Sequence, residues 1–244
     1  MYQLYVKNHL IDTDTKKIRK NSIFFALKGE RFNGNHFAKD AIDKGAAYSV
    51  IDEKEYEIPG ATILVENVLK TLQELANYHR RQLGIPILAI TGSNGKTTTK
   101  ELINAVLETQ FKTDATQGNL NNHIGVPLTL LSFTAKTEIG IVEMGANHQK
   151  EIEFLCSICD PDIGYITNFG KAHLEGFGGI EGVIRGKSEL YTYLKEHRKM
   201  ALVNSKDPKQ VALSQGIESF ELNDSVIHTS EKAFLEILYH DQII

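Results

Sequence analysis

The stretch that decides the fold reads Ile87-Leu88-Ala89-Ile90-Thr91-Gly92-Ser93-Asn94-Gly95-Lys96-Thr97-Thr98-Thr99. Residues 87–90 are apolar without alternation, which is typical of a strand buried on both faces of a parallel sheet. A glycine-rich turn follows, and the residues from Thr97 onward predict a helix with four apolar residues on one side, Leu102, Ile103, Val106 and Leu107. A strand, a glycine-rich turn and a helix in this order form the context of a phosphate-binding loop.

The turn carries the groups that a triphosphate needs. Gly92 and Gly95 let the backbone turn sharply and approach phosphate closely. Free amides at the helix start favour an anion. Lys96 can reach the β- and γ-phosphate oxygens, and the Thr97 hydroxyl is placed to coordinate magnesium. We therefore expect ATP and magnesium to bind at Gly92, Ser93, Asn94, Gly95, Lys96, Thr97 and Thr98.

The loop departs from the common pattern, which has a glycine five residues before Gly95. Ile90 stands there instead, so the loop is a shorter Gly-x-x-Gly-Lys-Thr form that starts at Gly92. The alternative interpretation is a glycine-rich turn with a chance Lys-Thr pair. The flanking strand and helix favour the phosphate loop.

Three groups downstream are candidates for the same site. Glu143 ends an apolar strand at 139–142, and ligands of parallel sheets bind beyond the carboxyl ends of the strands. A carboxylate there suits magnesium, although a solvated glutamate at a strand end is the alternative. His173 follows a strand at 163–167, and it could bind a second metal, orient a phosphate or be structural. By composition alone, Lys187 in the helical stretch 180–194 would be an exposed surface lysine.

A polar loop at 119–127 contains Asn121 and Asn122. Their amides could recognise sugar or peptide groups. Asn and Gly clusters are equally common as simple turn formers, so both interpretations stay open.

The chain divides into two α/β units. Residues 1–82 predict a small unit, residues 83–86 a linker, and residues 86–244 a mainly parallel-sheet ATPase unit, because helical stretches lie between its strands. Expected strands are 22–27, 47–51, 62–65, 87–90, 139–142, 163–167, 201–204 and 217–220, with helices at 37–44 and from Leu69 onward. Residues 234–239 and 243–244 predict an unfinished hairpin around a turn at 240–242, so we expect a fragment of a longer protein.

Composition restricts the function classes. The chain has 244 residues, 41% hydrophobic and 24% charged, as in soluble globular proteins. A net charge of −4 gives no reason to expect nucleic acid or an anionic membrane as a partner. There is no apolar stretch of about 18 residues and no signal-peptide h-region, so we expect a cytoplasmic protein. We also expect a monomer. Cys156 and Cys159 supply half of a zinc site at most, and two reduced, partly buried thiols are expected.

Together these motifs resemble the Mur ligase family, which builds bacterial peptidoglycan precursors. Segment 24–30 and the Asn-Asn-x-x-Gly-x-Pro run resemble most the branch that adds D-alanyl-D-alanine to UDP-N-acetylmuramoyl-tripeptide. The matching stretches are 24–34, 91–100, 119–127, 143–145, 167–174 and 182–190.

The resemblance implies ATP-dependent amide formation through an acyl phosphate, with Lys96, His173 and Lys187 as catalytic residues. It implies two magnesium ions, one held by Thr97 and Glu143 and the second near His173. Lys187, between Gly186 and Ser188 where the family more often has Ala and Gly, matches a lysine that carbon dioxide carbamylates to support magnesium.

The resemblance also implies substrate contacts at Asp14, Thr15, Lys28, Gly29, Asn121 and Asn122. Lys16 stands where an arginine is common in the family. Family members have three domains, of which this chain would cover the first and most of the second. We therefore expect that the 244-residue chain does not ligate alone.

One rival interpretation is a related ligase, either one that adds a diamino acid or a folylpolyglutamate-type enzyme. Another is a general P-loop NTPase. A further rival is a non-catalytic nucleotide-binding module. That module would bind ATP without responding to a UDP-sugar peptide.

Overall fold

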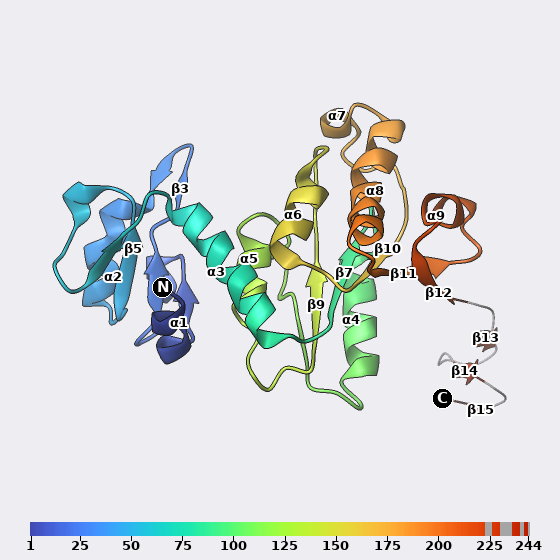
Figure 1. The fold of residues 1–244 in the computed structure, drawn as a ribbon, viewed down its shortest axis with the longest axis horizontal. Coiled ribbons are helices and arrows are strands. Elements are labelled where there is room, and N and C mark those ends of the chain that lie inside the picture. The colour runs from blue at the N-terminus through green and yellow to red at the C-terminus, as the bar shows by residue number, and fades with distance from the viewer. Residues whose placement is uncertain (223–225, 230–235, 240–241, 244) are drawn as a thin grey trace.

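The computed structural model describes residues 1–222, 226–229, 236–239 and 242–243, and it shows an α/β protein with two parallel sheets (Figure 1). The first sheet has the order β1-β2-β5-β6, and all its neighbouring strands are parallel. Its elements are α1 (Tyr2–Asn8), β1 (Ile11–Asp12), β2 (Ile23–Phe25), α2 (Ala38–Asp43), β5 (Tyr48–Ile51) and β6 (Thr62–Leu64). The strands and the helix expected here are confirmed.

A short antiparallel hairpin, β3 (Lys28–Gly29) and β4 (Phe32–Asn33), follows β2. Three single turns of 3-10 helix, Thr15–Lys17, Gly34–Phe37 and Lys54–Tyr56, complete this unit.

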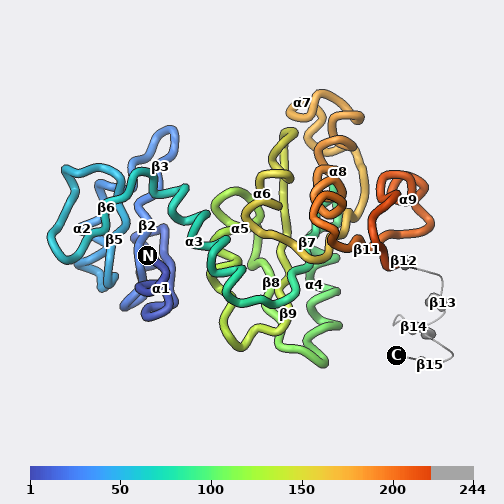
Figure 2. The backbone as a smooth tube through the Cα atoms, in the orientation of Figure 1, coloured from blue at the N-terminus to red at the C-terminus, as the bar shows by residue number. Residues whose placement is uncertain are grey.

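Helix α3 (Val68–Leu83) leads from the first sheet to the second. The Asn67 side chain accepts a hydrogen bond from the Lys70 amide and caps its start, and Gly84 in the left-handed region ends it. Its buried residues include Leu72, Leu75 and Ala76, at the helical spacing that the sequence predicted. The helix packs against α5 (Gly125–Leu130) and α6 (Glu151–Cys159) (Figure 2).

The second sheet has six parallel strands in the order β12-β11-β10-β7-β9-β8. Strand β7 (Ile87–Thr91) lies inside it and is buried at every residue, as predicted. The others are β8 (Thr113–Ala115), β9 (Ile139–Glu143), β10 (Ile163–Ile166), β11 (Met200–Asn204) and β12 (Glu218–Leu222). Strand β8 was not expected, because a strand of three residues is too short to give a periodic signal.

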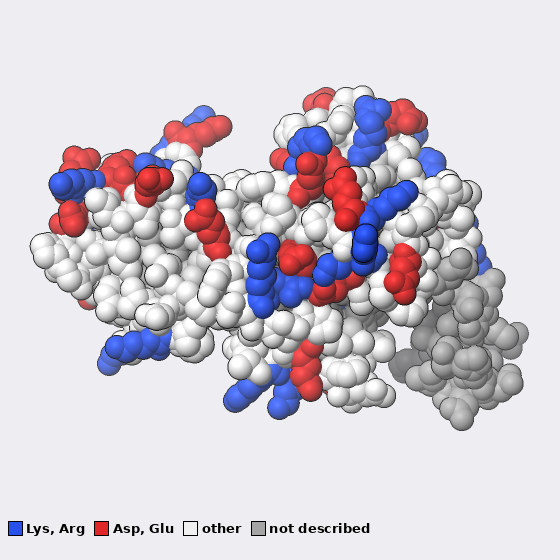
Figure 3. All heavy atoms as spheres, viewed as in Figure 1, with Lys and Arg blue, Asp and Glu red and all other residues white. Residues whose placement is uncertain are grey.

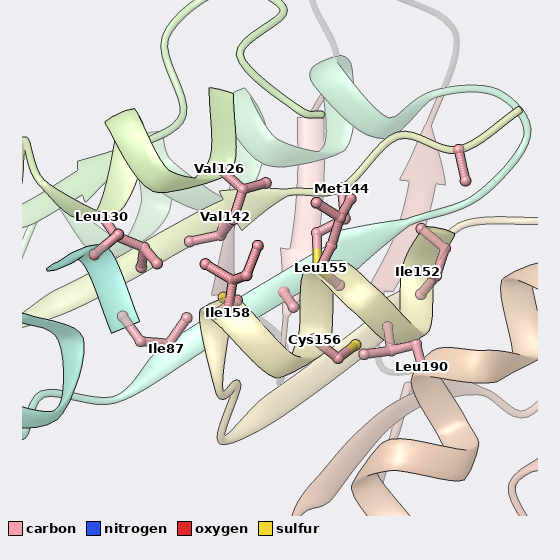
Figure 4. Close-up of a cluster of buried hydrophobic side chains, with 14 of the residues drawn as sticks. Ile87, Val126, Leu130, Val142, Met144, Ile152, Leu155, Cys156, Ile158 and Leu190 are labelled. Atoms are coloured by element: carbon pink, nitrogen blue, oxygen red, sulfur yellow. The ribbon is translucent and has the colours of Figure 1, made fainter. Parts of the chain in front are cut away.

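Helices cover both faces of this sheet. Ile87 and Ala89 face one side, where α5, α6 and α8 (Ile180–Glu196) enclose the largest core (Figure 4). Leu88 and Ile90 face α4 (Lys96–Leu107) on the other side. Two short helices, α7 (Leu174–Phe177) and α9 (Pro208–Leu213), complete the unit.

The orientation of α4 corrects one expectation. Leu102, Ile103, Val106 and Leu107 do not share one buried side: Ile103 and Leu107 pack on the sheet, whereas Leu102 and Val106 are 64% and 69% exposed. The residue that continues the buried stripe one turn earlier is Lys100, which is completely buried.

Near the C-terminus, β13 (Val226–Thr229), β14 (Glu236–Tyr239) and β15 (Gln242–Ile243) pair as an antiparallel sheet. The pairing of β14 with β15 agrees with the predicted hairpin. Its turn residues 240–241 lie outside the described residues, as do 234, 235 and 244.

Cys156 and Cys159 are free and fully buried rather than partly buried, and burial raises the pKa of both thiols. Among the described helices, none is long and apolar enough to cross a bilayer.

Candidate phosphate-binding site

The phosphate loop joins β7 to α4 at an edge where two loops meet closely. Gly92 has φ 143° and Gly95 has φ 77°, in the region that favours glycine. A β-carbon on Gly92 would lie 2.0 Å from the Thr167 hydroxyl oxygen and 3.0 Å from the Thr167 amide nitrogen. The first glycine of the motif is therefore required by contact with the loop after β10, in addition to its backbone angle.

The loop after β10 holds the phosphate loop in shape. The Ser93 amide donates to the Asn168 carbonyl at 3.1 Å, and the Ser93 hydroxyl donates to the Gly170 carbonyl at 2.9 Å. Asn168 accepts from the Asn94 amide at 3.2 Å and donates to the Asn94 carbonyl at 3.0 Å, while the Thr167 hydroxyl donates to that carbonyl at 2.7 Å. The local sequence motif does not include Thr167 and Asn168, although both are polar residues at a neighbouring strand end.

Lys96 is folded back over its own loop. Its ammonium nitrogen lies 2.8 Å from the Gly92 carbonyl oxygen and 3.3 Å from that of Ser93. Burial lowers its pKa, and the nearby Glu143 carboxylate acts in the opposite direction. A cavity of about 410 Å³ beside it is lined by Ser93, Asn94, Gly95, Lys96, Thr97, Thr98, Asn121 and Glu143.

Glu143 and Thr97 meet at this cavity, as expected. The Thr97 hydroxyl donates to Glu143 Oε2 at 2.9 Å, and the Asn121 amide donates to Glu143 Oε1 at 2.7 Å. Glu143 is only 1% exposed, so the alternative of a solvated strand-end glutamate is wrong. The amide of Glu143 donates to the Thr116 hydroxyl at 2.9 Å, which fixes the backbone at the strand end.

The donors at this point fit magnesium. A hydroxyl and a carboxylate supply hard oxygen ligands, and magnesium usually takes only one or two protein carboxylates and completes its shell with water and phosphate. Within the described residues there is no cluster of three or more His, Cys, Asp and Glu side chains that could hold a metal without such partners.

A second, larger cavity adjoins the first. It measures about 630 Å³, and Lys96 and Asn121 line both cavities. His173 is exposed, begins α7 in the left-handed region with φ 53° and also lines the larger cavity. Asn122 lines it as well, and its side chain accepts from the Ile124 and Gly125 amides at the start of α5. Asn122 is therefore a turn former that also lines a cavity, and recognition of sugar or peptide groups by its amide stays a prediction.

Lys187 is not a surface lysine. It is 1% exposed, its ammonium donates to the Ala146 carbonyl at 3.1 Å, and it lies 5.1 Å from the centre of the Phe177 ring. Burial, and then the charge of Lys96, lower the pKa of Lys187 to about 8. Composition missed this residue because lysines are usually exposed. The signal in the sequence is its helical spacing from Val183 and Leu190, which lie on the same buried side of α8.

The N-terminal candidates occupy two places. Lys28 and Gly29 line a cavity of about 480 Å³ at the β3–β4 hairpin, next to the stacked rings of Phe32 and Phe37. Lys28 pairs with Asp52 at 2.9 Å and with Glu53 at 3.2 Å, and the hydrogen bond to Asp52 raises its pKa. Asp14 and Thr15 do not line that cavity.

Asp14 caps the short helix Thr15–Lys17 by accepting from the amide of Lys16, which is exposed.

Figure 3 shows a hollow between the lobe with the hairpin and the lobe with α7, and charges of both signs are interspersed on this face.

Comparison with known families agrees with this geometry. Residues 7–89 match the family model described as "Mur ligase family, catalytic domain", and residues 90–243 match "Mur ligase middle domain". The chain belongs to the Mur ligase family.

Curated relatives are UDP-N-acetylmuramoyl-tripeptide–D-alanyl-D-alanine ligases. The Bacillus subtilis ligase is 43% identical over 190 residues, covering 77% of this chain and 42% of the relative. The Escherichia coli ligase is 39% identical over 195 residues, covering 80% of this chain and 43% of the relative. The chain therefore spans less than half the length of these ligases.

Solved Mur ligase structures show the same fold. The MurF ligase of Thermotoga maritima in complex with ADP superposes with a TM-score of 0.82 at 28% identity, covering 100% of this chain and 58% of that one. A MurF structure from Acinetobacter baumannii has a TM-score of 0.81 at 30% identity, covering 96% of this chain and 53% of that one.

Proposed function

We propose that the protein is an ATP-dependent amide ligase that adds D-alanyl-D-alanine to UDP-N-acetylmuramoyl-tripeptide in peptidoglycan precursor synthesis. The observation that carries the proposal is the position of Lys96, which lines both the phosphate cavity and the larger cavity beside His173. A phosphoryl group held in the first cavity would lie next to a carboxylate held in the second. Identity of about 40% to ligases of this name supports the choice of substrates.

The reaction has two steps. A carboxylate oxygen of the tripeptide attacks the γ-phosphorus of ATP, the bond to the ADP oxygen breaks, and an acyl phosphate forms. The amine of D-alanyl-D-alanine then attacks the acyl carbon, loses a proton and expels inorganic phosphate. Phosphorylation is needed because a carboxylate by itself has a poor leaving group.

The residues of the phosphate loop would hold and orient the triphosphate. Backbone amides from Ser93 to Thr98 bind phosphate oxygens, and Lys96 leaves its own loop carbonyls to neutralise the transferring group. Thr97 and Glu143 would hold one magnesium ion, and His173 would act near a second. When bound, magnesium would stabilise the charge that develops on the phosphates.

Lys187 is proposed to carry a carbamate. A pKa of about 8 leaves a useful fraction of its amine neutral near neutral pH. The neutral nitrogen attacks the carbon of carbon dioxide and loses a proton, which turns a buried cation into an anion. That anion would face the positive charge of Lys96, the second-largest cause of the lowered pKa.

The remaining assignments are proposals on the same basis. Residues 1–82 would bind the UDP-sugar peptide through Asp14, Thr15, Lys28 and Gly29, with Asn121 and Asn122 nearer the reacting end. Residues 86–244 would form the ATP-binding domain of a cytoplasmic monomer. That the 244-residue chain does not ligate alone stays a prediction, which phosphate release with all substrates tests.

Binding of acceptors separates the rival functions. We expect calorimetry of the chain with magnesium and an ATP analogue to give about tenfold tighter binding of UDP-N-acetylmuramoyl-tripeptide than of the corresponding dipeptide or a dihydrofolate. Equal binding of tripeptide and dipeptide would favour a diamino-acid ligase. ATP binding with no response to any acceptor would favour a non-catalytic module.

A further inference from the structure

A completely buried lysine that the proposed reaction does not use lies one turn beyond the phosphate loop. Lys100 is 0% exposed and is the buried residue of α4, on the stripe that faces the sheet with Ile103 and Leu107. A buried ammonium is costly unless hydrogen bonds and charges compensate it, and an apolar side chain at this position would avoid that cost. The contacts of Lys100 indicate what the charge does there.

The Lys100 ammonium donates to the Thr116 carbonyl oxygen at 2.5 Å. Thr116 follows β8 and is 1% exposed, and its own amide donates to the Ile141 carbonyl of β9 at 2.9 Å. The Thr116 hydroxyl accepts from the amide of Glu143 at 2.9 Å. Lys100 therefore holds the residue to which the backbone of the candidate magnesium ligand is fastened.

These bonds close a ring. Thr97 donates to the Glu143 carboxylate, the Glu143 amide donates to Thr116, and Lys100 donates to Thr116. Thr97 and Lys100 lie three residues apart on α4, so they are neighbours on the helix surface. The ring fixes the separation between α4 and the end of β9, and with it the separation between the Thr97 hydroxyl and the Glu143 carboxylate.

The surface partner of Lys100 does not explain the arrangement. Glu101 lies 2.8 Å from the ammonium, but its side chain is 63% exposed, and exposed carboxylates contribute little to ion pairs. The bond to the buried Thr116 carbonyl is the contact that an apolar residue could not make.

We infer that Lys100 is a positioning residue for the metal site: through Thr116 it holds Glu143 at the distance from Thr97 that magnesium requires. The inference rests on the proposed function, because it takes Thr97 and Glu143 as magnesium ligands. Lys100 lines neither the phosphate cavity nor the larger cavity beside it, and it would act through the backbone of Glu143. Residues that orient metal ligands in this way typically change metal affinity by about 10- to 100-fold when removed.

The test compares ATP binding with and without magnesium. Calorimetry measures ATP affinity of the 244-residue chain in excess magnesium and in EDTA, for the wild type and for Lys100→Met. Methionine keeps an unbranched side chain of nearly the same length and removes the donor. We expect Lys100→Met to weaken binding in magnesium about tenfold and to change binding in EDTA less than about twofold. A purely structural role would lower thermal stability and leave the ratio of the two affinities unchanged.

A matched control and a second variant complete the test. Glu101→Gln keeps Lys100 and removes its exposed partner, and we expect it to leave the affinity ratio unchanged. If Lys100→Met does not fold, Thr116→Val tests the same connection to Glu143. This variant keeps the carbonyl that accepts from Lys100 and removes the hydroxyl that accepts from the Glu143 amide. It too should weaken binding selectively in magnesium.

The outcomes are distinct. A wild-type chain whose ATP binding ignores magnesium overturns the proposed metal site and this inference together. This inference alone is overturned if the wild type responds to magnesium and folded Lys100→Met has the same affinity ratio as the wild type. If Lys100→Met does not fold, an unchanged ratio in Thr116→Val overturns it.

Discussion

At the scale of single residues, Lys96 lines the candidate phosphate cavity, whereas Lys187 and Lys100 are buried cations. Gly92, Lys96 and Thr97 follow from a local motif, because one strand, one turn and one helix start place them. Lys187 and Lys100 gave no such signal. Helical spacing places both lysines on apolar stripes, but it does not show that a charged residue on such a stripe is buried. That burial depends on how α8 and α4 pack against distant parts of the chain.

The lowered pKa of Lys187 gives a prediction about stability and pH. A folded-state pKa of about 8, below the ordinary 10.5, means that protonating Lys187 opposes folding below about pH 8 and ceases to do so as the pH rises toward 10.5. Lys187→Met removes this effect. We expect its free energy of unfolding, relative to wild type, to fall by about 2 kcal/mol between pH 7 and pH 10.

Urea denaturation of both proteins at pH 7, 8.5 and 10, under carbon-dioxide-free conditions, measures this change. A difference that does not vary with pH would mean that Lys187 has an ordinary pKa in the folded protein. Without a lowered pKa, the proposed carbamate would lose its main support.

At the scale of elements, regular helices and buried strands were predictable and the contacts between loops were not. The alternation of Leu88 and Ile90 with Ile87 and Ala89 onto two cores follows from a strand buried on both faces. Strand β8 was too short to predict. The bonds from Thr167 and Asn168 to the phosphate loop join residues far apart in the chain, and Asn94 and Asn168 are 74 positions apart. The structure was needed to show why Gly92 must lack a side chain.

The contact between those two loops makes Gly92→Ala a specific test. An added β-carbon would meet the Thr167 hydroxyl at 2.0 Å and its amide at 3.0 Å, so the loops must separate. We expect ATP affinity to fall at least about tenfold. The positive φ adds a separate conformational cost of about 1 kcal/mol for any alanine in the folded chain.

Gly60→Ala is the control for that cost. Gly60 has φ 78° and open space around it, far along the chain from the loop. Calorimetry with ATP should show the loss in Gly92→Ala and none in Gly60→Ala. Equal affinities for both variants would mean that the loops tolerate the added group.

At the scale of the whole molecule, α3 ties the first unit to the second. Arg80 on α3 is 6% exposed, donates to the Cys159 and Asp160 carbonyls, and pairs with Asp162 at 2.5 Å. A charged residue in the last turn of a helix is usually exposed, so the sequence alone predicts an exposed Arg80. Here the guanidinium satisfies carbonyls at the end of α6, which explains why it is buried.

Removing Arg80 should therefore weaken the whole fold. We expect Arg80→Met to lower the free energy of unfolding by about 3 kcal/mol, because it leaves the Cys159 and Asp160 carbonyls without their side-chain donor. It also removes one donor from Asp162, which keeps its bond to Lys199. The neighbouring Arg81 is 64% exposed and 3.9 Å from Asp160, so Arg81→Met should cost less than about 1 kcal/mol. Equal losses in urea denaturation would show that Arg80 is no more important than a surface arginine.

The loop from Gly92 to Thr98 is proposed to bind the triphosphate of ATP, with Lys96 holding the terminal phosphates. The most direct measurement is calorimetric titration of magnesium and ATP into the wild-type chain and into Lys96→Ala, with circular dichroism to establish that both are folded. We predict saturable one-to-one binding by the wild type and a loss of at least about a hundredfold in the variant. Unchanged ATP affinity in folded Lys96→Ala would contradict the account.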